Sequence, residues 1–148
     1  MCCANSCLSA HEDLGKSAMD AISLLQSDTF HTLSAILIGS VWVFHGLYSK
    51  ILNRIPRHRL IVGRILGERF AQPATRVIGG GEVLLGVWVF TGWQPLGCAV
   101  VQTLALIAMN ALEILLAGDL LISALGMVVL NLGFIALVWH WAIVASKS

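Results

Sequence analysis

The stretch VWVFHGLYSKIL, residues 41–52, decides the fold because it joins an apolar helix to the basic part of the chain. Its first residues continue an apolar run that begins near Thr32, and Lys50 ends that run. A membrane-spanning helix needs about 20 mostly apolar residues, so residues 32–50 predict a first span. His45 lies inside this span, where an ionisable group is costly and usually has a function.

The composition of the whole chain indicates the same class of protein. Of the 148 residues, 57% are hydrophobic and 11% are charged, whereas soluble domains have about 45–50% apolar and about 25% charged residues. Three further apolar stretches follow the first. The sequence therefore predicts an all-α integral membrane protein, a four-helix bundle with short loops. Its spans are expected at residues 32–50, 77–93, 98–117 and 120–144.

A polar N-terminal tail, residues 1–30, precedes this membrane domain, residues 31–148. Apolar residues recur at helical spacing in the tail, which predicts a short helix lying at the bilayer surface. Its cysteines and one histidine are close enough in sequence to suggest a metal or disulfide site, but they match no zinc-ligand spacing. We therefore predict no metal site and expect incidental thiols in a frayed tail. These residues are Cys2, Cys3, Cys7 and His11.

Seven of the nine Lys and Arg residues lie between the first two predicted spans. Because Lys and Arg near span ends stay on the cytoplasmic side, we expect this loop in the cytoplasm and both termini outside, in a bacterial inner membrane. Pro56 and Pro73 bracket a basic, amphipathic segment that suits the membrane interface, where its cations would contact lipid headgroups or another anionic ligand. The residues predicted to bind lipid or anion are Lys50, Arg54, Arg57, Arg59, Arg64 and Arg69.

Every predicted span also carries a polar residue inside the membrane. With a rise of about 1.5 Å per residue, His45 and Glu82 lie about 7 and 9 Å above the cytoplasmic ends of their spans. The polar residues of the third and fourth spans lie in the same half or near the midplane. Such groups usually face the bundle interior and mark function. We therefore predict a ligand-binding pocket formed by His45, Glu82, Asn110, Glu113 and Asn131.

A second interpretation is that these residues only hold the helices together. Glu82 would then pair with His45 or Lys50, and Glu113 would pair with an arginine of the basic segment. Lys50 itself is expected to anchor the first span at the membrane boundary, outside the pocket.

Two cofactor classes are disfavoured by the positions of the residues. His45 and His140 lie roughly 20 Å apart along the membrane normal, which is too far for one haem iron. Gly79, Gly80 and Gly81 follow no strand and match no nucleotide-binding loop, although their small faces would leave room for an apolar ligand. We expect no nucleic acid partner.

A set of aromatic, small and ionisable residues carries a resemblance to a known family. Its members are Trp42, His45, Gly46 and Lys50 in the first span, Gly81, Glu82, Leu85 and Gly86 in the second, and Asn131 in the fourth. Over roughly residues 32–143 the chain thereby resembles the DoxX-like family of small four-helix membrane proteins, in the DoxX/DoxD superfamily. That family includes the membrane subunit of a thiosulfate:quinone oxidoreductase, bacterial proteins with redox and oxidative-stress partners, and eukaryotic proteins that assist cargo export or receptor assembly.

The residues and the resemblance together imply two functions. In the first, the protein is a redox-linked membrane subunit that binds a quinone or similar apolar ligand. His45 would hydrogen-bond the ligand's oxygen, and Glu82 or Glu113 would pass protons to the cytoplasm. In the second, it is a non-catalytic scaffold or assembly factor. The expected partners are the lipid bilayer, a redox partner protein and further copies of the chain, and the pattern does not require an enzyme.

Overall fold

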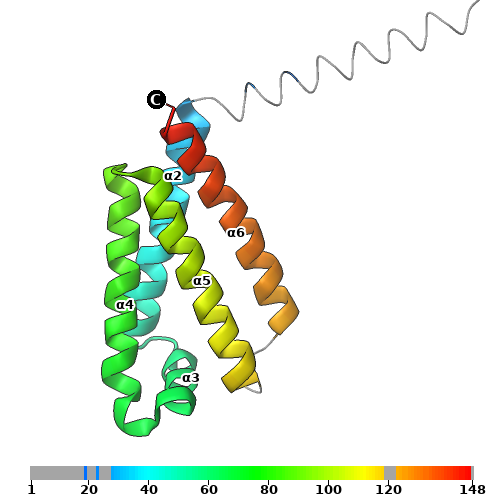
Figure 1. Ribbon diagram of the computed structural model, residues 1–148. Coiled ribbons are helices and arrows are strands. Elements are labelled where there is room, and N and C mark those ends of the chain that lie inside the picture. The colour runs from blue at the N-terminus through cyan, green and yellow to red at the C-terminus, as the bar shows by residue number, and fades with distance from the viewer. Residues whose placement is uncertain (1–18, 20–22, 24–27, 119–122, 148) are drawn as a thin grey trace, which may run out of the picture. The chain divides into compact units, whose positions relative to one another are not determined.

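The computed structural model describes residues 19, 23, 28–118 and 123–147. This part of the chain is helical and has no strand (Figure 1), which confirms the predicted all-α class. In chain order the helices are α2 Asp28–Val43, η1 Phe44–Ile51, α3 Pro56–Leu66, α4 Glu68–Thr91, α5 Pro95–Ala117 and α6 Ala124–Ala145.

The chain divides into two compact units, Met1–Leu33 and Ser34–Ser148. The predicted polar tail, residues 1–30, belongs to the first unit. The expected surface helix and the cysteines of the tail fall almost entirely outside the described residues. All of the features described below belong to the second unit, apart from the first residues of α2.

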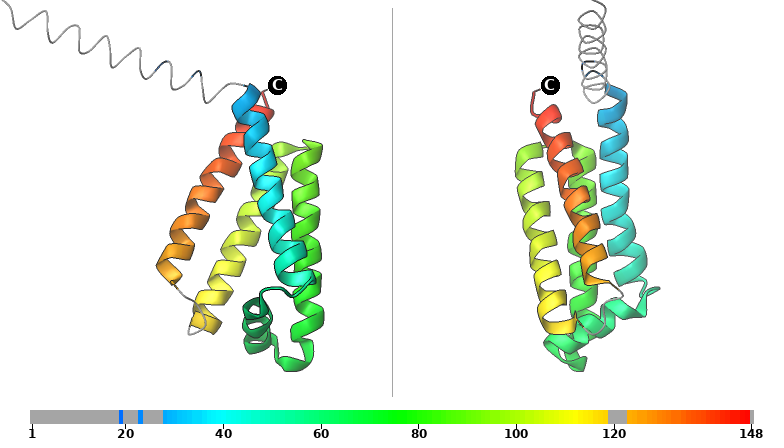
Figure 2. Two further views of the ribbon diagram at one scale, coloured as in Figure 1. Left: turned by 180° about the vertical axis from the view of Figure 1, so that it is seen from behind. Right: turned by 90° about the vertical axis from the view of Figure 1, so that its right-hand side faces the viewer.

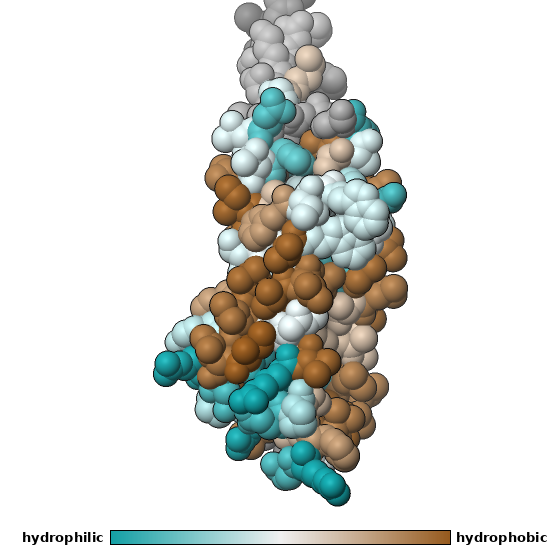
Figure 3. Space-filling model, turned by 90° about the vertical axis from the view of Figure 1, so that its left-hand side faces the viewer, coloured by the Kyte–Doolittle hydropathy of each residue, from teal (hydrophilic) through white to brown (hydrophobic). Residues whose placement is uncertain are grey.

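Four helical stretches are long and apolar enough to cross a membrane. They are Asp28–Ile51, Glu68–Thr91, Pro95–Ala117 and Ala124–Ala145. Large apolar side chains such as Val77, Leu84 and Leu115 are at least 70% exposed on these helices, as lipid-facing residues are. Hydrophobic residues cover the middle of the face in Figure 3, and hydrophilic ones gather at the end where α3 lies. The chain is an integral membrane protein.

The first span contains an eight-residue π-helix, η1, that the sequence pattern did not predict. At its end the N–H of Leu52 donates to the carbonyl oxygen of Leu47 at 2.9 Å, the five-residue spacing of a π-helix. In an α-helix, residues five apart point about 140° apart, because one turn takes 3.6 residues. Five-residue hydrogen bonding brings them close to one face instead. Consequently His45 and Lys50 lie on a common face of η1.

The second span begins at Glu68 instead of residue 77 and ends at Thr91. Pro73 was expected to precede the helix but lies inside it, where a proline removes one backbone hydrogen bond. The break between α3 and α4 falls at Gly67, whose φ of 88° is readily adopted only by glycine. The basic interfacial segment therefore splits into the short helix α3 and the beginning of α4.

A tight turn joins α4 to α5. Gly92 and Gln94 have φ values of 64° and 49°, in the left-handed region, and Pro95 is the first residue of α5, where its fixed φ suits a helix start. The predicted spans, 77–93 and 98–117, placed this connection slightly too late in the chain. The short connection makes α4 and α5 antiparallel neighbours (Figure 2).

The first and second spans approach each other through glycines. A Cβ added to Gly79 would lie 2.7 Å from the carbonyl oxygen of Gly46, and one added to Gly86 would lie 2.8 Å from that of Gly39. Only residues without a side chain allow such backbone contact between membrane helices. A Cβ added to either of the two glycines that follow Gly79 would meet no atom of another helix within 4 Å.

The buried core occupies the end of the second unit away from α3. Its members are Ile38, Trp42, Val89, Cys98, Ala99, Leu106, Val138, Trp141 and Ala142. Inside it, Trp42 Nε1 donates to Gln102 Oε1 at 2.6 Å and Gln102 Nε2 donates to Cys98 Sγ at 3.2 Å. Toward the other end α4 and α6 diverge, and α3 lies there against α4, α5 and η1 (Figures 1 and 2).

Candidate functional site

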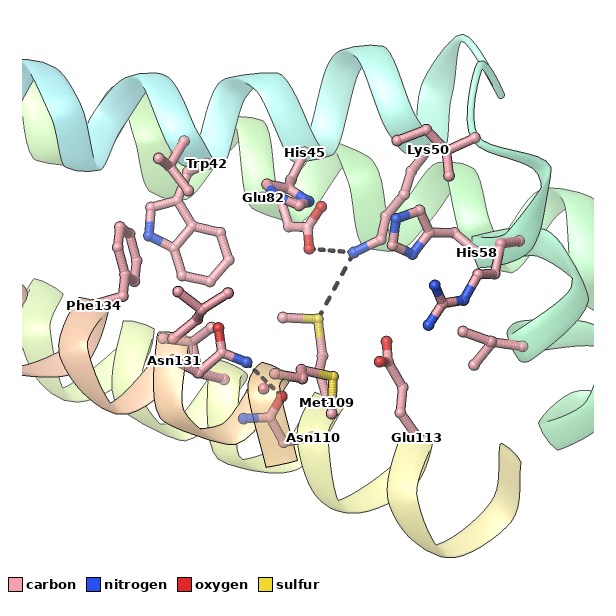
Figure 4. Close-up of a pocket in the computed structure, with 18 of the residues that line it drawn as sticks. Trp42, His45, Lys50, His58, Glu82, Met109, Asn110, Glu113, Asn131 and Phe134 are labelled. Carbon is pink, nitrogen blue, oxygen red and sulfur yellow. Dashed lines mark hydrogen bonds and ion pairs between the residues drawn. The ribbon is translucent and has the colours of Figure 1, made fainter. Parts of the chain in front are cut away.

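A pocket of about 670 Å³ lies between the helices at the α3 end of the bundle. Its walls come from α2, η1, α3, α4, α5 and α6 (Figure 4). The structure brings together at this pocket all of the residues predicted to bind a ligand, which are His45, Glu82, Asn110, Glu113 and Asn131. That they bind a ligand stays a prediction.

The pocket changes from apolar to polar along its length. At the core end the rings of Trp42 and Phe134 meet edge to face, with centroids 6.2 Å apart. Figure 4 shows the paired asparagines beyond them, and Lys50, His58 and Glu113 at the opposite end. Gly79, Gly80 and Gly81 do not line the pocket. The expectation that they leave room for a ligand is therefore wrong, because Gly79 packs against Gly46.

An ion pair joins η1 to α4 inside the pocket. Lys50 and Glu82 are only 6% and 4% exposed, and Lys50 Nζ donates to Glu82 Oε1. Lys50 Nζ also lies 3.8 Å from Met109 Sδ, while Glu82 Oε2 has no hydrogen-bond partner among the described residues. The expectation that Lys50 only anchors the helix outside the pocket is wrong, because the π-helix turns it inward.

A neutral amide pair joins α5 to α6 across the same pocket. Asn131 Nδ2 donates to Asn110 Oδ1 at 2.7 Å. Each amide has a carbonyl oxygen and an NH₂ group, so this bond leaves the Asn110 NH₂ and the Asn131 oxygen for further partners. Both side chains line the pocket.

Two histidines from different elements meet at the polar end. The ring centroids of His45 on η1 and His58 on α3 are 6.3 Å apart. Burial is the main cause that lowers the pKa of His58 to about 4, and the charges of Lys50, His45 and Arg57 act in the same direction. His58 is therefore uncharged at neutral pH. The sequence analysis did not include His58 among the pocket residues. Residues three apart share one face of a helix, so the spacing of His58 from Ile61 on the amphipathic α3 is a signal that could have placed it in the pocket.

Comparison with known proteins identifies the family of the chain that forms this pocket. A family model described as the DoxX-like family matches residues 39–139. The chain belongs to the DoxX-like family. This confirms the resemblance seen in the sequence, and the matched region contains every residue that lines the pocket. Comparisons with curated proteins and with solved structures gave no match.

In this DoxX-like chain the predicted lipid- or anion-binding residues separate into two groups. Lys50 and Arg57 line the pocket, and the Nε atom of Arg57 is buried without a partner among the described residues. Glu113, which was considered as a partner for an arginine, makes no ion pair within the part of the chain that the structure describes. The remaining four residues are exposed; they are Arg54, Arg59, Arg64 and Arg69.

Proposed function

We propose that this DoxX-like protein is a redox-linked membrane subunit whose pocket binds a quinone or a similar apolar ligand with polar oxygens. The observation that carries the proposal is the polarity gradient from Trp42 and Phe134 to the ionisable groups at the α3 end. Ligand sites are typically about 300–1,000 Å³, mostly apolar, with a few convergent polar groups, and the pocket of about 670 Å³ agrees with this description.

The polar residues take different roles in this proposal. His45 hydrogen-bonds a ligand oxygen at the polar end of the pocket. Glu82 is held by Lys50, whereas Glu113 makes no ion pair with the described residues and is better placed to take up and release a proton. His58 stays uncharged at neutral pH because its pKa is lowered to about 4, so it contributes a neutral imidazole to the polar end of the pocket and does not hold the proton.

The quinone content of the purified protein tests the proposal. Extracts of the detergent-purified protein are expected to contain quinone in near-stoichiometric amount by mass spectrometry. Met127→Trp fills the pocket and should remove the quinone. Leu125→Trp places the same side chain on the same helix at a 75% exposed position outside the pocket, and it should retain the quinone. Equal quinone content in both variants, or none in the wild type, contradicts the proposal.

A scaffold or assembly factor is the second candidate function. The observation that favours it is that both polar pairs, Lys50 with Glu82 and Asn110 with Asn131, connect neighbouring helices. Quinone content, measured together with cross-linking in intact membranes, separates the two functions. A redox subunit loses its quinone in Met127→Trp. A scaffold contains no quinone, and in that variant it keeps the cross-links to its protein partners or to further copies of the chain.

We also propose that the basic α3 lies on the cytoplasmic side of a bacterial inner membrane, with both termini outside. The support is the concentration of Lys and Arg between the first two spans. A membrane-impermeant thiol reagent tests it in a variant without the native cysteines. A cysteine at exposed Glu68 should react only after the cells are opened, and one at exposed Gln94 should react in intact cells. The reverse pattern contradicts the orientation.

A further inference from the structure

Only one of the two carboxylate oxygens of Glu82 has a hydrogen-bond partner among the described residues. Glu82 is 4% exposed, and Lys50 Nζ donates to its Oε1 atom. The Oε2 atom is buried and has no hydrogen-bond partner among the described residues. A buried polar atom without a partner is unfavourable, and the penalty is larger for a charged group. Because Glu82 lines the pocket, a ligand there can supply the missing hydrogen-bond donor.

The neighbouring groups restrict what that ligand can be. Lys50 directs its ammonium group to Glu82 and to Met109 Sδ. Among the pocket residues, the second buried atom without a described partner is Arg57 Nε, which is a donor. Among the buried side-chain atoms of the pocket residues, Glu82 Oε2 is therefore an acceptor and Arg57 Nε a donor without a described partner. A hydroxyl group can both donate and accept, whereas a carbonyl oxygen can only accept.

We infer that the pocket selects the hydroxyaromatic, reduced form of its ligand, a hydroquinone, over the corresponding quinone. The inference rests on the proposed function and names the ligand class of the same site. One ring hydroxyl donates to Glu82 Oε2, a second ring oxygen accepts from Arg57, and the apolar part extends toward Trp42 and Phe134. A quinone carbonyl at Glu82 would place two acceptor oxygens against each other and leave the carboxylate unsatisfied.

The size of the preference follows from a single hydrogen bond to a charged group. Such a bond corresponds to roughly a ten- to hundredfold difference in affinity. The hydroquinone and the quinone differ by two electrons and two protons. Tighter binding of the reduced form therefore raises the midpoint potential of the bound couple, by about 30 mV for each tenfold preference.

Three probes test the inference on the protein without substitutions. A decyl-substituted benzoquinone, its hydroquinone and the dimethyl ether of that hydroquinone are titrated into the detergent-purified protein without oxygen. The ether has the same ring and chain but no O–H donor. We expect the hydroquinone to bind about tenfold or more tightly than either of the other two. If the quinone or the ether binds as tightly as the hydroquinone, the inference is overturned while the proposed function stands; if no probe binds, both are overturned.

Variants then assign the preference to Glu82. In Glu82→Gln the preference for the hydroquinone should fall severalfold or disappear, because the amide NH₂ of glutamine can also donate to a quinone carbonyl. Glu68→Gln makes the same chemical change at an exposed position of the same helix, outside the pocket, and should keep the full preference. If Glu82→Gln does not fold, because Lys50 is left unpaired, the double variant Lys50→Gln/Glu82→Gln replaces the ion pair by a neutral pair. A preference unchanged in the variant that folds contradicts the assignment.

Discussion

The two ends of the helical bundle bury their polar groups in different ways. At the core end Trp42, Gln102 and Cys98 form a neutral chain of hydrogen bonds. At the α3 end Lys50 and Glu82 form a buried ion pair that leaves one carboxylate oxygen without a described partner. The first arrangement is internally satisfied, and the second is open to a further molecule.

This difference indicates which end serves stability and which serves binding. A buried ion pair is weak evidence for stability, because desolvation of the charges offsets much of their attraction. A neutral hydrogen bond joins helices without that cost. A bundle that required only cohesion could use neutral pairs throughout, as it does at Gln102 and between Asn110 and Asn131. The buried charges of Lys50 and Glu82 beside the pocket therefore favour a ligand-binding site over a role in helix packing alone.

Separating the ion pair should have the largest effect on stability. Glu82→Leu leaves the buried Lys50 without its partner, and such changes cost about 3–5 kcal/mol. Lys50→Met/Glu82→Leu removes both charges and should recover most of that loss. Thermal unfolding in detergent measures both variants. A single variant as stable as the double variant would show that Lys50 reaches solvent on its own.

A smaller loss is expected at the core end. Gln102→Leu leaves the buried Trp42 Nε1 without an acceptor, which costs about 1–3 kcal/mol. Gln72→Leu is the matched control, because its hydrogen bond with Arg59 is exposed and long, at 3.5 Å. The free energy of unfolding should change by less than about 0.5 kcal/mol in that control. Equal losses in both variants contradict a core held by the Trp42–Gln102 bond.

His58 should make the pocket end sensitive to acid. Its folded-state pKa of about 4 lies below the ordinary value near 6.5, so between these two pH values the unfolded chain binds more protons. Stability therefore falls as pH drops from about 6.5 to 4, by on the order of 1 kcal/mol after discounting for partial exposure. His58→Gln should remove this component of the pH dependence. A wild-type profile identical to that of the variant contradicts a buried, neutral His58.

The exposed cations should have the smallest effect on stability and act through lipid. Arg64→Gln/Arg69→Gln should change unfolding in neutral detergent by less than about 0.5 kcal/mol. The affinity of the embedded protein for anionic lipid should weaken by about 1 kcal/mol per removed charge. Native mass spectrometry of retained anionic lipid measures the difference. Unchanged lipid retention would remove these arginines from the predicted lipid-binding set.

Most of the fold and part of the candidate site could be predicted from the sequence, because the geometry of an α-helix is regular. Depth along an α-helix is set by a constant rise per residue, so polar residues at similar depths on separate spans could be identified as neighbours. His45, Glu82 and Asn110, which all line one pocket in the structure, illustrate this agreement. The four spans followed in the same way from length and apolar content.

The predictions were wrong in two kinds of place. In one, the backbone departs from a regular α-helix. In the other, a segment expected to be a loop forms a helix. Lys50 was placed outside the pocket because the π-helix, which turns it toward Glu82, has no signal in the apolar pattern. Pro73 suggested a helix start but is tolerated inside α4. His58 was missed because the contacts of α3 with α4, α5 and η1 are tertiary. Local periodicity does not report these contacts.

Photo-crosslinking with an azido-benzoquinone, followed by mapping of the labelled peptides, tests most directly the claim that the pocket end is the binding end. The label is expected on pocket residues such as Trp42, Met109 and Met127, and an excess of the unmodified benzoquinone or its hydroquinone should prevent it. Labelling confined to lipid-facing residues such as Leu84 and Leu125, unaffected by competitor, would contradict the account.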